Sequence, residues 1–92
     1  MPIVDPALVA AAELGEEARK FQESDLGKCL LGMALQEADL AKDALSKVDP
    51  SDFKKITELQ NTVRLYQSFK DWLGELVDEG NSALEIFKQQ KD

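Results

Sequence analysis

Residues 49–90 read DPSDFKKITELQNTVRLYQSFKDWLGELVDEGNSALEIFKQQ, and this stretch decides the fold. Its apolar face recurs every three or four positions, at Phe53, Ile56, Leu59, Val63, Tyr66, Phe69, Leu73, Leu76, Gly80, Leu84 and Phe87. This is the spacing of a coiled-coil seam on one long amphipathic helix. Such a face must be covered by other helices, so the pattern predicts an all-α protein that acts through contacts between helices.

A sharp turn precedes this helix. Proline disfavours helix at the residue before it, and Asp49 can cap a new helix that has Pro50 in its first position. Asp5-Pro6 and Ser24-Asp25 mark two earlier helix starts. We therefore expect helices at about residues 6–22, 25–47 and 50–90. They should form an antiparallel helical hairpin, a coiled-coil-like bundle in which the first two helices lie end to end along the third.

The third helix is either continuous or broken near Gly80. Gly80 can end a helix, and Ser82 followed by Glu85 matches a capping box that would start another. The chain is short enough for a single domain, residues 1–92. That domain has three helices, or four if the break is present.

The expected inner face of residues 25–47 contains one acidic residue among apolar ones. Its members are Leu26, Cys29, Leu30, Met33, Ala34, Glu37, Leu40, Ala41, Ala44, Leu45 and Val48. We expect Cys29 to be a buried free thiol, because unpaired cysteine behaves as a small hydrophobic residue. A buried Glu37 carboxylate needs a partner. Arg64 lies opposite if the hairpin turns near Asp49, and the pair would then fix the register. The alternative is that a local rotation leaves Glu37 in solvent.

Composition argues against several classes of function. A net charge of -7 disfavours direct binding to nucleic acid or to anionic lipid. The chain has no histidine, the commonest general base and metal ligand, and one cysteine without a histidine cannot form the usual thiol dyad. We expect a non-enzyme without catalytic residues, metal or cofactor. The start MPIVDP lacks the features of a signal peptide, and no apolar run is long enough to span a membrane, so we expect a cytoplasmic protein.

Two surfaces are candidates for function. Apolar residues at the edge of the seams, or outside them, predict self-association as a homodimer or larger oligomer, or binding of another protein: Leu31, Leu35, Trp72, Val77 and Ile86. Carboxylates gather at the end away from the turn: Glu13, Glu16, Glu17, Glu75, Asp78 and Glu79. They could imitate a phosphate array and inhibit a nucleic-acid-binding or defence enzyme of a host. An ordinary soluble surface is the alternative, because basic residues are interspersed.

The chain also contains SDLGKCLL at residues 24–31, VDP at 48–50, ELQN at 58–61 and SFKDWL at 68–73. In these strings it resembles small helical proteins of unassigned function encoded by tailed bacteriophages. The resemblance implies a phage accessory or morphogenesis protein in the host cytoplasm, and it assigns no role to any residue. We therefore expect a phage accessory or assembly protein that acts through helix-mediated protein contacts, with the acidic inhibitor as the alternative.

Overall fold

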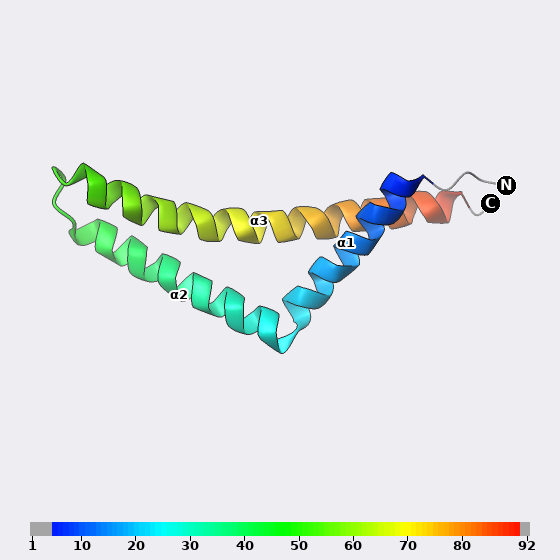
Figure 1. The fold of residues 1–92 in the computed structure, drawn as a ribbon, viewed down its shortest axis with the longest axis horizontal. Helices are drawn as coiled ribbons and strands as arrows, with labels where there is room; N and C mark the ends of the chain where they lie inside the picture. The colour runs from blue at the N-terminus through cyan, green and yellow to red at the C-terminus, as the bar shows by residue number, and fades with distance from the viewer. Residues whose placement is uncertain (1–4, 91–92) are drawn as a thin grey trace.

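The computed structural model describes residues 5–90, and these form three α-helices packed against each other with no strand among them. The helices are α1 (Pro6–Glu23), α2 (Asp25–Lys47) and α3 (Phe53–Gln89). Figure 1 shows α2 returning beside the first half of α3 and α1 crossing α3 near its C-terminal end. The all-α prediction is confirmed. Residues 1–4 and 91–92 of the expected domain lie outside the described residues.

A single residue, Ser24, separates α1 from α2. Its backbone N–H donates to the Lys20 carbonyl at 2.9 Å, and its hydroxyl oxygen accepts from the Gly27 N–H at 2.9 Å. Ser24 has an extended backbone, with φ -72° and ψ 153°, so the chain changes direction there. A Cβ atom on Gly27 would lie 1.6 Å from the Phe21 carbonyl oxygen. Any side chain at this position would overlap that oxygen, so only glycine fits there. The two helices therefore form a V, and they do not lie straight along α3 as expected (Figure 1).

The turn between α2 and α3 lies where the sequence predicts it, but α3 begins at Phe53 and not at Pro50. Asp49 does not cap the helix. Its side chain accepts from the Ser51 N–H at 2.9 Å and the Ser51 hydroxyl at 2.8 Å, which closes the turn itself. The cap is Asp52, whose side chain accepts from the Lys55 N–H at 3.1 Å. Asp49 therefore stabilises the turn and Asp52 caps α3, whereas the sequence predicts Asp49 as the cap.

Gly80 does not break α3, which is continuous to Gln89. It marks the point where α1 crosses α3. A Cβ atom on Gly80 would lie 2.7 Å from the Cα atom of Gly15, and a Cβ atom on Gly15 would lie 2.8 Å from the Leu76 carbonyl oxygen. The two backbones can approach this closely only because neither glycine carries a side chain. Gly80 serves packing between helices, and the capping-box match at Ser82 lies inside the helix.

The expected inner face of α2 is only partly confirmed. Ala41 is buried as predicted, and four further expected residues are half-buried: Ala34, Ala44, Leu45 and Val48. The buried face follows one heptad phase, in which Gly27, Ala38 and Ala41 are buried and Leu31, Ala34, Leu45 and Val48 are half-buried. Several expected inner residues are exposed instead: Leu26, Cys29, Leu30, Met33 and Leu40. The prediction of a buried Cys29 thiol is therefore wrong. The fully buried positions of this row are glycine and alanine only: Gly27, Ala38 and Ala41.

The buried core is correspondingly small. Its buried hydrophobic residues are Ala18, Ala38, Ala41, Leu73 and Ala83. The molecule is long and thin, with extents of 65 × 27 × 16 Å. Most of the large apolar side chains therefore remain at the surface, and this is the feature that positions the candidate site.

Candidate functional site

The α2–α3 hairpin has one apolar side and one polar side. Each helix carries a second heptad row, one residue before its buried row. Because α2 and α3 are antiparallel, these two rows fall on the same side of the hairpin. We call this the apolar side and define it as Met33, Glu37 and Leu40 on α2 with Thr62, Leu65, Phe69 and Trp72 on α3.

The side chains on the apolar side are strongly exposed. Leu65 is 67% exposed, Leu40 64%, Met33 58% and Trp72 54%. The opposite face, the polar side, exposes mainly charged and amide side chains together with one large apolar residue, Leu35, which is 41% exposed. Its charged and amide residues are Lys28, Asp39 and Lys42 on α2 with Gln60, Arg64, Gln67 and Asp71 on α3, all exposed. Ordinary solvent-facing helices expose residues like those of the polar side. The concentration of large apolar groups on the other side therefore needs a physical explanation.

An open groove of about 350 Å³ runs along the apolar side between the two helices. Its walls are Ala34 and Glu37 from α2, and Thr62, Leu65, Tyr66, Phe69 and Trp72 from α3. A smaller hollow continues toward the turn along Leu40, Ala41 and Leu59. The groove is therefore an elongated, mostly aromatic and aliphatic channel.

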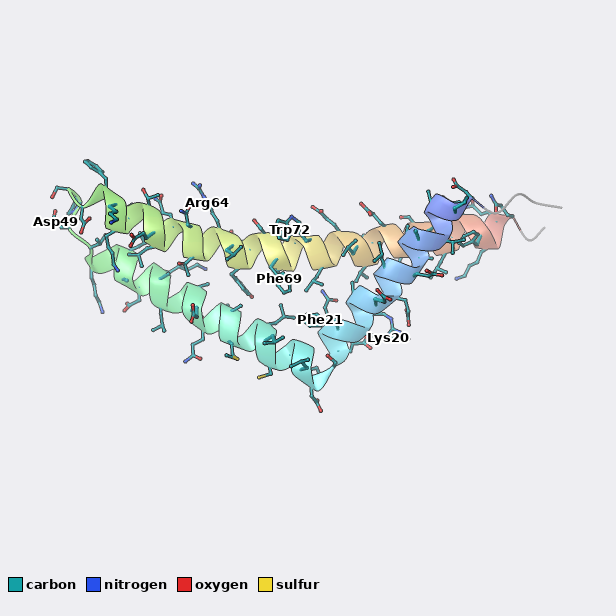
Figure 2. The ribbon with its side chains drawn as sticks, in the orientation of Figure 1. Lys20, Phe21, Asp49, Arg64, Phe69 and Trp72 are labelled. Atoms are coloured by element: carbon teal, nitrogen blue, oxygen red, sulfur yellow. The ribbon has the colours of Figure 1, made fainter. Side chains whose placement is uncertain are left out.

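An aromatic contact lies at Phe69, one of the residues in the groove wall. The rings of Phe21 and Phe69 meet edge to face, with their centroids 6.3 Å apart. Figure 2 shows both side chains between α3 and the bend that joins α1 to α2. This contact ties the end of α1 to the middle of α3 and holds Phe69 at the groove wall.

Glu37 is the charged side chain in the groove wall, and it does not meet Arg64. Glu37 lies on the apolar side and Arg64 on the polar side, where its side chain points away from α2 (Figure 2). Both are exposed, and the ion pairs found within residues 5–90 include neither. The expected register pair is not formed, because Glu37 lies outside the buried row of α2, between half-buried Ala34 and buried Ala41. The alternative given by the sequence, a solvated Glu37, is the one observed.

The other expected interaction residues are distributed over several faces. Trp72 belongs to the apolar side, while Leu35 and Ile86 are exposed elsewhere. Leu31 lies half-buried in the α2–α3 seam, and Val77 is half-buried on α3. The heptad periodicity predicts Met33, Leu40 and Phe69 in the seams and assigns no face to Leu65. A second heptad phase, one residue before the first on both helices, is the signal that would have found this side.

At the acidic end, three expected carboxylates line one shallow hollow on α1 together with Lys20: Glu13, Glu16 and Glu17. Arg19 makes an ion pair with Glu16 and another with Glu23, the latter at 2.8 Å. The hydrogen bond from Arg19 lowers the pKa of Glu16, and the two carboxylates raise the pKa of Arg19. Glu75, Asp78 and Glu79 are exposed on α3 near the crossing at Gly80. Acidic and basic groups are thus mixed at this end.

The described residues show neither a metal cluster nor a membrane helix. Within residues 5–90, no three or more cysteine or carboxylate side chains are grouped to hold a metal ion. Among the same residues, no helix has both the length and the apolar character needed to cross a bilayer.

Comparisons of the chain with protein-family models, with curated proteins and with solved structures found no match.

Proposed function

We propose that the chain is a non-enzymatic accessory or assembly protein that acts through helix-mediated contacts with other proteins. The observation that carries this proposal is the apolar side of the α2–α3 hairpin, which exposes large residues in two adjacent rows. Contiguous apolar patches of this kind are rare on soluble monomers and mark sites of interaction. The resemblance of four sequence strings to small helical phage proteins supports a role in a bacteriophage, in the cytoplasm of its host.

The groove on this side supports helix-mediated contact in particular. It is open along its length, and its walls are aliphatic and aromatic side chains such as Leu65, Phe69 and Trp72. An amphipathic helix lays its apolar face into a groove of this kind, with anchors spaced by three or four residues.

We propose no second function for the acidic end. A nucleic-acid mimic needs a run of carboxylates with little opposing charge. Here Arg19 pairs with Glu16 and with the neighbouring Glu23, and Lys20 lines the same hollow as Glu16. The inhibitor remains the alternative that the sequence raised, without an observation that favours it.

Capture from cells that carry the gene in its natural context tests the proposal. Three tagged forms would be compared: the unaltered chain, Leu65→Glu on the apolar side and Gln67→Glu on the polar side. Both variants add one negative charge to the same helix, and both positions are exposed. We expect the unaltered chain and Gln67→Glu to retain the same proteins, including untagged copies, and Leu65→Glu to lose them. Equal retention by all three forms would refute an interaction function for this side.

A further inference from the structure

We propose that a second copy of the same chain covers the apolar side, so that two α2–α3 hairpins pack face to face as a two-fold homodimer. The inference rests on the proposed interaction function and names the partner. Its first support is surface area: the chain exposes 7070 Å², whereas a compact monomer of this size exposes about 5,300 Å². The radius of gyration, 18.9 Å, also exceeds the roughly 12 Å expected for a compact domain of this length.

The size of this surplus fits a homodimer. The excess, about 1,750 Å² per chain, is spread over the whole elongated molecule; if pairing removed all of it, the interface would bury about 3,500 Å² in total, within the range of obligate homodimers. The surplus exceeds the share of roughly 800 Å² that one partner contributes to a standard-size interface. The dimer interface would also add a core of large apolar side chains. The single chain lacks such a core, because the buried core within residues 5–90 contains only small residues and Leu73.

The shape of the apolar side suits contact with its own copy. Two helices present two adjacent rows of large side chains, among them Met33 and Leu40 on α2 and Leu65 on α3. Two such layers stacked face to face form a four-helix bundle with a common apolar core. A two-fold axis brings the same patch from each copy together and closes the assembly at two chains. The polar sides of both hairpins then face water.

Charge gives this dimer a recognisable signature. Each chain has a net charge of -7, so two copies repel each other, and apolar burial must overcome that repulsion. Added salt screens the repulsion and should therefore strengthen a homodimer. A basic foreign partner would respond in the opposite way, because salt weakens attraction between unlike charges. Whether added salt strengthens or weakens binding thus distinguishes a second copy of the chain from a basic foreign partner.

Sedimentation and light scattering of the purified full chain test the proposal. Four forms would be compared over a range of protein and sodium chloride concentrations: the unaltered chain, Leu65→Glu, Leu40→Glu and the polar-side control Gln67→Glu. We expect the unaltered chain and Gln67→Glu to have twice the mass of one chain. Each apolar-side variant should raise the dissociation constant at least about tenfold, because its new carboxylate would be buried without a partner. Circular dichroism checks that the exposed substitutions leave the helices intact.

Several results would overturn the homodimer. These are a monomeric unaltered chain at high concentration, a closed assembly of more than two copies, or equal association of the Leu65→Glu and Gln67→Glu forms. Self-association that weakens with added salt would overturn packing through the apolar side. If the purified chain is monomeric but Leu65→Glu abolishes capture of other proteins, only the homodimer is refuted. The proposed function then stands. A monomeric chain whose capture ignores Leu65→Glu would refute both.

Discussion

Replacing Gly80 by alanine should separate α1 from α3. The added methyl group would lie 2.7 Å from the Cα atom of Gly15 and 3.1 Å from the Ala11 carbonyl oxygen. Both atoms belong to backbone inside a helix, so no flexible side chain can move aside. Either α1 shifts as a whole or the crossing opens.

The magnitude follows from two opposing effects. Overpacking of a tight contact costs about 1–3 kcal/mol, whereas alanine in a helix interior is about 1 kcal/mol more favourable than glycine. Gly74 supplies the matched control: it lies in the same helix, and a Cβ atom there would meet nothing within 4 Å. Gly74→Ala should therefore stabilise the protein by up to about 1 kcal/mol. The difference between the two variants isolates the packing cost, about 1–3 kcal/mol.

Urea unfolding at one fixed protein concentration measures this difference, since stability of an associating protein depends on concentration. Thermal unfolding should agree, at roughly 4–8 °C per kcal/mol for a domain of this size. If Gly80→Ala gained as much stability as Gly74→Ala, the close backbone crossing would be wrong. A loss of stability in both variants would contradict the open space at Gly74.

Three further changes test other parts of the fold. Gly27→Ala should cost more than about 2 kcal/mol in urea unfolding, because its methyl group would overlap the Phe21 carbonyl at the bend; an unchanged midpoint would contradict the bend. Hydrogen bonds within the turn lower the pKa of Asp49, so its contribution to stability is present above its ordinary pKa and is lost as pH falls through the lowered folded value. Asp49→Asn should therefore lower the free energy of unfolding at neutral pH and lower it less in acid. A difference in unfolding free energy between the variant and the unaltered chain that is the same at all pH values would refute this. Glu37→Ala and Arg64→Ala should have additive effects on unfolding, since the two side chains lie on opposite sides of the hairpin; a coupling energy above about 0.5 kcal/mol would show contact.

Local signals are sufficient to predict the three helices and the starts of α1 and α2. Asp5-Pro6 begins α1 and Ser24 begins α2 where the sequence predicts, because a cap forms hydrogen bonds with residues two or three positions away. The start of α3 was misplaced by three residues. Asp49 and Asp52 are both able to cap, and only the geometry of the turn decides which one does.

Gly80 shows where local reasoning fails. A glycine followed by a capping-box pattern fits the end of a helix, and the same glycine fits a close crossing of two helices. The choice depends on Gly15, which lies far away in the sequence and has no local pattern that points to Gly80.

The partly wrong prediction of the inner face of α2 has a similar origin. This helix carries two heptad rows one residue apart, and periodicity alone cannot say which row faces α3. The more apolar row, with Leu30 and Met33, was the natural choice. The structure instead buries the row with Ala38 and Ala41, and this leaves the apolar side exposed. The same ambiguity explains why Glu37 does not pair with Arg64 and why Met33 and Leu40 are exposed.

The crossing of Gly15 with Gly80 also constrains how the chain is made. A ribosome releases α1 first and its docking surface on α3 last, so Gly15 must wait until Gly80 has been synthesised. At roughly 5–20 residues per second this interval lasts several seconds. During it, the C-terminal end of α1 can contact α2 and then Phe69, while the α2–α3 hairpin closes from its turn as α3 emerges. The crossing of Gly15 with Gly80 is therefore the last of these contacts to form.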